Sequence, residues 1–291
     1  MPSSRVVLPM TSSRVVLPLL VAAFLSIAPV VRGEHRPVCY ECLCKVKELG
    51  FYVALPDGYD CDPPPPGSTP VPSPIVHLDA SIESMVSGSG DAINGQSGQT
   101  WPMVGGCTRT QHNGVDVFDM TYPPCGFRTG EAKAFCGSDF GWTTADWVDW
   151  RDDIFSGYEY RSLHSMNTGH TLVMSKLTEL GSYIPAGDGA GFNPIPNYSF
   201  LPEGWTLVVA VGQGTACGTT AGTTSFYVGT PTTHPNLVGT IGYSVGGVQN
   251  GNTYGYGYWG PGYAAESRVW NQALTYEEIE TLWVETSPKF Q

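Results

Sequence analysis

Basic residues are scarce in this sequence. Only 14 lysines and arginines stand against 26 aspartates and glutamates in 291 residues, so the formal net charge is −12. Arg5, Arg14 and Arg32 fall in the first 33 residues, which leaves 14 − 3 = 11 basic residues and a charge of −15 for the rest of the chain. A surface this acidic repels phosphate backbones, so we expect no nucleic acid partner.

Patterns that mark common catalytic and metal sites are missing as well. The chain has no G-x-S-x-G nucleophile turn and no H-E-x-x-H zinc motif, and its six histidines are scattered. Loops with D-x-D-x-D-G spacing, which supply oxygen ligands for calcium, are also absent. We therefore expect no enzymatic activity, no catalytic residues and no required cofactor. A calcium site assembled from separate loops stays open.

Long apolar runs occur only at the N-terminus. Residues 1–33 combine basic Arg5 and Arg14 with an apolar run over residues 15–31, and they predict a signal peptide cleaved before Glu34. The run is about seventeen residues long and contains Pro18 and Pro29, which is short for a membrane helix of roughly twenty residues. A retained membrane anchor is the alternative. We expect a secreted or cell-surface protein whose mature chain has no stable membrane span.

All eight cysteines follow this leader and form two groups of four. In an oxidising compartment, even groups of cysteines favour disulfides, with two bridges and three possible pairings in each group. Zinc binding by the first group is less favoured, because the fourth thiol is distant and no histidine follows at ligand spacing. The groups are Cys39, Cys42, Cys44 and Cys61, and Cys107, Cys125, Cys136 and Cys217.

A proline tract separates the two cysteine groups. Residues 63–74, PPPPGSTPVPSP, predict an extended polyproline II linker. Residues 34–62 before it form a cysteine-rich module that is too short to fold without cross-links. Residues 75–288, after the proline tract, are predicted to form one large domain. The 36 glycines, 24 prolines and 12 % aromatic residues of the chain favour many short strands.

Hydrophobic patterns divide this domain into strands, loops and one internal helix. We expect strands at residues 75–80, 115–120, 170–176, 205–211, 225–228 and 237–244, and loops at 87–99, 185–202 and 213–224. Residues 143–156 predict an amphipathic helix, because Trp147, Trp150 and Ile154 recur at helical spacing and the acidic residues between them would face solvent. Asn197 begins an Asn-Tyr-Ser triplet and is the expected N-glycosylation site.

The C-terminal region has the clearest local signals. Residues 264–270 predict a strand, and Thr275 with Glu278 forms a capping box for a following helix, with Leu274 packing on Ile279. The motif E-x-R-V-W-N at Glu266 and 268–271, followed by A-L-T-x-E-E-I at 273–279, resembles the closing signature of the laminin G-like, concanavalin A-like lectin/glucanase superfamily. An H-L-D-A-S opening at 77–81 and the strand at 205–211 agree with it.

This resemblance implies an all-β jelly-roll sandwich of two antiparallel sheets, and it does not imply catalysis. Retaining glucanases of the superfamily carry two glutamates in an E-x-D-x-E or E-x-D-x-x-E strand, and the chain has neither pattern. Glu266 is alone on its strand, so we expect it to pair with Arg268 or to cap the helix. A glycoside hydrolase is the least favoured function.

Alternating tyrosines suggest a binding surface. Tyr254, Tyr256 and Tyr258 alternate with glycine, so in a strand their rings share one face, with Trp259 at the margin. Such rings stack on sugars, although three rings on one strand also suit the inner layer of a sandwich. We predict a carbohydrate-binding recognition module that binds a glycan through these residues. The alternative is a structural or adhesive protein of the extracellular matrix or cell surface that binds other proteins.

Overall fold

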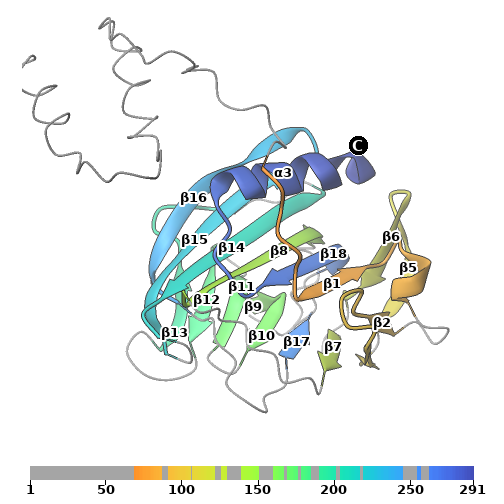
Figure 1. Ribbon diagram of the computed structural model, residues 1–291, viewed down its shortest axis with the longest axis horizontal. Coiled ribbons are helices and arrows are strands. Elements are labelled where there is room, and N and C mark those ends of the chain that lie inside the picture. The colour runs from red at the N-terminus through yellow and green to blue at the C-terminus, as the bar shows by residue number, and fades with distance from the viewer. Residues whose placement is uncertain are drawn as a thin grey trace, which may run out of the picture. The chain divides into compact units, whose positions relative to one another are not determined.

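The computed structural model describes most of the chain after residue 68. The described residues are 69–86, 91–105, 107–121, 126–129, 139–150, 160–166, 169–175, 178–184, 190–200, 204–216, 219–244, 254–256 and 262–291. They form two large antiparallel sheets, a separate two-stranded sheet and one C-terminal α-helix that covers the outer face of the first large sheet (Figure 1). The cysteine-rich module predicted at 34–62 and the signal peptide predicted at 1–33 lie outside these residues.

The first sheet contains eight strands. In spatial order they are β16 (Thr233–Tyr243), β15 (Ala221–Thr230), β14 (Thr206–Gly214), β8 (Gly141–Trp150), β18 (Gly262–Trp270), β6 (Val115–Asp119) and β5 (Thr108–His112), with β1 (Val76–Asp79) also paired to β18. Strands β1 and β6 share one edge of β18, where β1 pairs with residues 266–269 and β6 with residues 263–264. This edge of β18 therefore changes partner near Ala265.

The second sheet lies beneath the first. In spatial order its strands are β13 (Gly191–Pro194), β12 (Leu180–Ile184), β11 (Gly169–Ser175), β10 (His164–Met166), β17 (Tyr254–Tyr256), β7 (Gly126–Thr129) and β4 (Met103–Val104), with β9 (Tyr160–Ser162) beside β11. A short pair, β2 (Ala92–Ile93) and β3 (Thr100–Trp101), and a 3-10 turn, η1 (Glu83–Met85), follow β1 in sequence. All these pairings are antiparallel, which confirms the predicted all-β sandwich.

Two hydrophobic cores cover the two faces of the first sheet. Trp142 and Val148 on β8 pack between the sheets, with Leu172 of β11. Trp147 of the same strand packs on the opposite face, with Ile279 of the helix. Neighbouring residues of a strand point to opposite faces, so a strand covered on both sides is buried at every position, as β8 is.

The helix predicted at 143–156 is therefore wrong over its described part, which lies in β8. Trp147 and Trp150 are three residues apart and match a helical face, but in the strand they point to different cores. Asp146, expected to face solvent, has no exposed surface. Because both faces of β8 are buried, no polar alternation marked it as a strand.

The C-terminal prediction is confirmed. Strand β18 covers the predicted residues 264–270, and α3 (Tyr276–Thr286) begins after Thr275 with both hydrogen bonds of the capping box. The hydrophobic side chains expected on one side of the helix are buried against the first sheet: Ile279, Leu282 and Trp283. A 3-10 turn, η3 (Ser287–Phe290), continues from α3 and buries Phe290.

Three predicted loops are shorter than expected. Residues 213–224 contain the ends of β14 and β15, residues 185–202 contain β13, and residues 87–99 contain β2. Glycine favours turns but does not prevent strand pairing, and here it has a packing role. A Cβ atom at Gly212 of β14 would overlap the ring of Trp142, so the glycine makes room for this large side chain.

The end of the predicted linker lies against the sandwich. The Trp270 indole nitrogen donates to the Pro72 carbonyl over 2.7 Å, and Val71 packs against the core beneath α3. Residues 69–74 thus lead directly into β1 (Figure 1). Within the described residues, no helix is both long and apolar enough to cross a membrane.

Candidate functional site

A β-bulge in β18 sets the position of the candidate site. Ala264 pairs with Val148 and Glu266 pairs with Trp147, so Ala265 is an extra residue on β18. A bulge of this kind changes the face to which the following side chains point. Ala264 faces the inter-sheet core, and after the bulge Glu266 and Arg268 lie on the face that carries α3.

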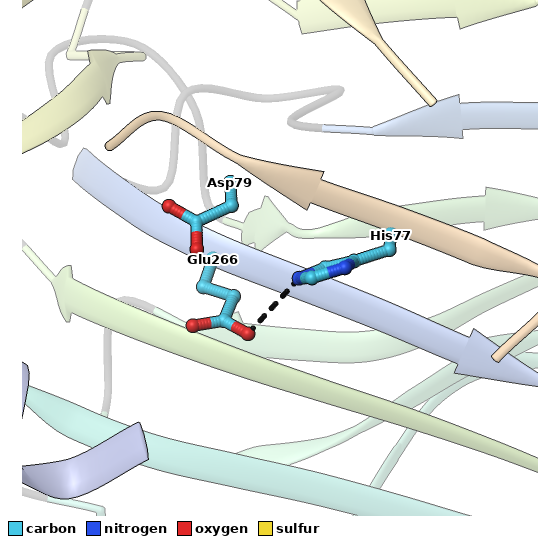
Figure 2. Close-up of side chains that lie close together, drawn as sticks. All are labelled: His77, Asp79 and Glu266. Atoms are coloured by element: carbon cyan, nitrogen blue, oxygen red, sulfur yellow. Dashed lines mark hydrogen bonds and ion pairs between the residues drawn. The ribbon is translucent and has the colours of Figure 1, made fainter. Parts of the chain in front are cut away.

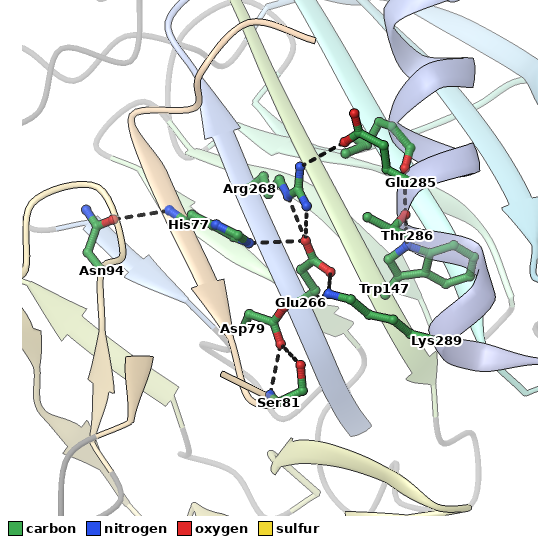
Figure 3. A network of polar contacts seen from close by, with 11 residues as sticks. His77, Asp79, Ser81, Asn94, Trp147, Glu266, Arg268, Glu285, Thr286 and Lys289 are labelled. Carbon is green, nitrogen blue, oxygen red and sulfur yellow. Dashed lines mark hydrogen bonds and ion pairs between the residues drawn. The ribbon is translucent and has the colours of Figure 1, made fainter. Parts of the chain in front are cut away.

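Glu266 is buried among three cationic or donor groups. Only 3 % of the residue is exposed. Its Oε1 accepts from Arg268 Nε over 2.6 Å and lies 3.1 Å from His77 Nε2, and its Oε2 accepts from Lys289 Nζ over 2.8 Å (Figure 3). The predicted pairing of Glu266 with Arg268 is confirmed, whereas Glu278 caps the helix.

Asp79 at the end of β1 completes the cluster. One of its oxygens accepts from the backbone and hydroxyl of Ser81 over 2.8 and 2.6 Å, and the other accepts from Lys289 Nζ over 2.7 Å. Lys289 therefore bridges the two buried carboxylates of Asp79 and Glu266. Burial alone would lower the pKa of Lys289, but the charge of Glu266 and the hydrogen bonds to Asp79 and Glu266 raise it above 10.5.

The same carboxylates could in principle bind a metal ion. One ligand atom from each of His77, Asp79 and Glu266 lies within 4.8 Å of the others (Figure 2). However, the ammonium of Lys289 already contacts both carboxylates at hydrogen-bond distance. Calcium needs six to eight oxygen ligands and would have to displace this ammonium. The cluster therefore fits an ion network closed by Lys289 better than a metal centre.

The acidity of Glu266 predicts a loss of stability in acid. Burial alone would raise its pKa, but the hydrogen bond from His77 and the charges of Arg268 and Lys289 outweigh burial and lower the pKa from 4.5 to about 2. Because the folded state binds this proton more weakly than the unfolded chain, the stabilisation is complete above about pH 5 and is lost as the pH falls toward 2. A change of this size corresponds to about 3 kcal/mol.

Urea denaturation at about pH 7, pH 4 and pH 2.5 measures this effect. The control is Glu266→Gln, which cannot titrate, so the difference in free energy of unfolding between wild type and variant should shrink as the pH falls. A difference that stays constant would contradict the lowered pKa.

A pocket of about 180 Å³ opens beside this network. We call it the Lys289 pocket. Its polar lining residues are Asp79, Ser81, Asp116, Glu266 and Lys289, and Val115, Ala265 and Phe290 are its apolar lining residues. The pocket lies where β18 changes partner from β1 to β6, and the turn between β5 and β6 closes one side. This turn contains Asn113 and Gly114, both with positive φ, as a two-residue hairpin requires.

Aromatic rings support the wall of the pocket. Phe290 lies between Trp147 and Trp205, with ring centroids 4.3 and 5.0 Å away. His112 stacks on Tyr263 at 3.8 Å, and its Nε2 lies 2.7 Å from an Asp149 carboxylate oxygen. These contacts hold η3 against the first sheet and tie the end of β5 to β18 and β8, so the pocket is formed by ordered packing.

The predicted tyrosine surface is only partly within the described residues. Tyr254 and Tyr256 lie in β17, which pairs with β10 on one side and β7 on the other. These two tyrosines are therefore in a strand, as predicted. The structure describes only the backbone of these two tyrosines. Tyr258 and Trp259 lie outside the described residues. The glycan-binding role of these four residues stays a prediction.

Two other predicted sites can be placed. Asn197 is exposed in a turn and has a φ of 58°. Cys107 is buried and forms a disulfide. The other seven cysteines lie outside the described residues, so the pairing of the second group, and the first group as a whole, stay predictions.

Sequence reasoning missed most of the Lys289 pocket. His77 and Asp79 belong to the H-L-D-A-S segment, but nothing in this segment indicated a pocket. Lys289 is 210 residues from Asp79 and 23 from Glu266. The Asn113-Gly114 pair was the one local signal of the hairpin that closes the pocket.

Known proteins resemble this chain in structure only. No protein-family model matches it, and no curated protein matches it by sequence. A crystal structure of an HCR/D mutant has a TM-score of 0.50 at 8 % identity over 73 % of this chain and 51 % of the other. The botulinum neurotoxin serotype D ligand binding domain in complex with N-acetylneuraminic acid has a TM-score of 0.46 at 7 % identity, over 74 % and 51 %.

A Trypanosoma rangeli sialidase in complex with the inhibitor DANA has a TM-score of 0.47 at 13 % identity, over 76 % of this chain and 34 % of the other. The chain thus spans about half the length of the first two structures and a third of the sialidase. The likeness to the first structure agrees with a β-sandwich fold. Membership of the laminin G-like superfamily stays a prediction.

Proposed function

We propose that this protein is a secreted, non-catalytic recognition module that binds carbohydrate in the Lys289 pocket. The observation that carries the proposal is the combination of fixed polar groups with apolar residues in one pocket. Lys289 Nζ uses two of its three donors on Asp79 and Glu266, which leaves one donor for a ligand hydroxyl. Val115, Ala265 and Phe290 add apolar lining against which sugar C–H groups can pack.

The size of the pocket suits a small ligand unit. About 180 Å³ is below the roughly 300 Å³ at which sites for drug-sized molecules begin. One sugar ring at the end of a glycan fits such a pocket better than an oligosaccharide does. We therefore expect recognition of a terminal sugar.

The charge state of Glu266 supports a binding role over hydrolysis. Glycosidases need a carboxylic acid that stays protonated near neutral pH and a second carboxylate that acts as base or nucleophile. Glu266 has a pKa of about 2, and both it and Asp79 bind the same ammonium. The buried pair of Asp146 and His164 has no exposed surface and cannot reach a substrate.

Secretion is part of the proposal. The disulfide of Cys107 favours an oxidising compartment, in agreement with the signal peptide expected at residues 1–33. The exposed Asn197 is accessible for glycosylation.

A glycan array with a blocking variant tests the binding site. We expect the wild type to show saturable glycan binding that free sugar competes. Ser81 is exposed and lines the pocket, so Ser81→Trp should fill the pocket and weaken this binding at least tenfold. The matched control is Thr223→Trp, at an exposed position of β15, three strands from β18. Thermal melts show whether both variants fold.

Three results would count against the proposal. Equal binding by Ser81→Trp and wild type would exclude the Lys289 pocket. Loss of binding in Tyr256→Ala alone would move the site to β17. The absence of any binding that free sugar competes would favour the structural or adhesive protein instead.

A further inference from the structure

We infer that the Lys289 pocket prefers a sugar that carries an amino group over an acidic sugar, an inference that rests on the proposed function. The first argument is the charge around the pocket. The ion pairs in and around the pocket involve five carboxylates, those of Asp79, Glu83, Asp116, Glu266 and Glu285, and three cations, those of Arg109, Arg268 and Lys289. The sum of 3 − 5 leaves two negative charges, in a chain whose formal charge is −12.

Lys289 is a poor partner for an acidic sugar. Its ammonium is already bound by carboxylate oxygens of Asp79 and Glu266 at 2.7 and 2.8 Å. A carboxylate on a ligand would approach a neutralised cation and two negative groups at once. Like charges that face one another disfavour binding, so the remaining Lys289 donor suits a neutral hydroxyl better.

Asp116 provides the negative charge that a ligand amine would meet. It lines the pocket, and 32 % of its side chain is exposed. Its partners hold it loosely: Arg109 Nη2 lies 3.7 Å away and Gln111 Nε2 lies 3.3 Å away. Arg109 is further shared with Glu83 at 3.7 Å and donates to the Ala80 carbonyl over 2.9 Å. The Asp116 carboxylate can therefore accept a hydrogen bond from an ammonium without breaking a short ion pair.

The positions of Lys289 and Asp116 give the pocket two different polar sides. Lys289 comes from η3 and Asp116 from β6 next to the β5–β6 turn, and Phe290 lines the pocket with them. A pyranose ring has hydroxyls around its edge, so one hydroxyl can accept from Lys289 while an amino substituent donates to Asp116. The pocket thus offers the ligand both an N–H donor and a carboxylate acceptor.

Isothermal titration with three matched probes tests the inference. The probes are a glucosamine oligosaccharide, the N-acetylglucosamine oligosaccharide of the same length, which is neutral, and an oligosaccharide that ends in N-acetylneuraminic acid. We expect the amino sugar to bind about tenfold more tightly than the neutral one, and the acidic sugar to bind more weakly than both. High salt should narrow these differences, because it screens exposed charges.

Two charge-matched variants show whether the preference comes from this pocket. Asp116→Asn should remove most of the advantage of the amino sugar over the neutral sugar. Glu277→Gln, at the opposite end of α3 from Lys289, changes the net charge equally and should leave the preference intact. An advantage that persists in Asp116→Asn, or that falls equally in both variants, would overturn the inference.

The results also separate the inference from the proposed function. If the acidic sugar binds as tightly as the neutral sugar, the inferred charge preference is overturned. If Ser81→Trp still abolishes binding in that case, the carbohydrate site remains in place. If none of the probes and no glycan binds, the proposed function and the inference both fail.

Discussion

Glu266→Gln is expected to lower the free energy of unfolding by about 3–5 kcal/mol, because it removes the shared anion of a buried ion network. The carboxylate accepts from Arg268 and Lys289 and contacts His77, and only 3 % of the residue is exposed. A neutral amide would leave Arg268 and Lys289 without this counter-charge. It would also turn an N–H donor toward one of these donor groups.

Glu285→Gln is the matched control for this variant. Glu285 belongs to the same network, but its carboxylate lies 3.8 Å from Arg268 Nη1 and is half exposed. Exposed pairs contribute roughly 0–1 kcal/mol, so this change should be small. Urea denaturation gives both free energies of unfolding. Equal effects of the two substitutions would show that burial of Glu266 does not determine the stability of the network.

Asp146→Ala is the second substitution with a large expected effect. Asp146 on β8 of the first sheet and His164 on β10 of the second lie 2.7 Å apart, and neither has exposed surface. This pair links the two sheets through the core. Removal of one partner of a buried pair costs about 3–5 kcal/mol, because the other is left in an apolar environment. The free energy of unfolding should fall by this amount.

The double variant Asp146→Leu with His164→Leu distinguishes a polar link from simple packing. The two leucines remove both polar groups of the pair, and replacements of buried ion pairs by apolar residues are often neutral or stabilising. One Asp146 oxygen already has no hydrogen-bond partner, which strengthens this expectation. We expect the double variant to be more stable than Asp146→Ala in urea denaturation. A double variant that is less stable would show that the link itself stabilises the sandwich.

The C-terminal end of the fold was predictable because its signals are local. Thr275 and Glu278 form the capping box within four residues, and Leu274 and Ile279 belong to the same core. Neither feature depends on distant parts of the chain, so both can be read from sequence. The strand before the helix, β18, was likewise predictable from a local signal, the Gly/Pro turn that comes directly before it in the sequence.

The strand β8 and the candidate site were not predictable in this way. In β8 the burial of both faces removed the polar alternation, and the spacing of Trp147 and Trp150 suggested a helix. The Lys289 pocket combines side chains from β1, β6, β18 and η3, which meet only in the folded sheet. The bulge at Ala265 depends on strand pairing and left no pattern in the sequence that predicts it.

This bulge makes the site depend on the register of β18 as well as on residue identity. If Ala265 were instead paired with Trp147, the following residues of β18 would shift by one position along β8, and Glu266 and Arg268 would exchange faces with their neighbours. Two charged side chains would then enter the core between the sheets, away from His77 and Lys289. Loss of the bulge with Ala265 still present would therefore be more disruptive than most substitutions, because the unpaired residue keeps Glu266 beside His77 and Lys289.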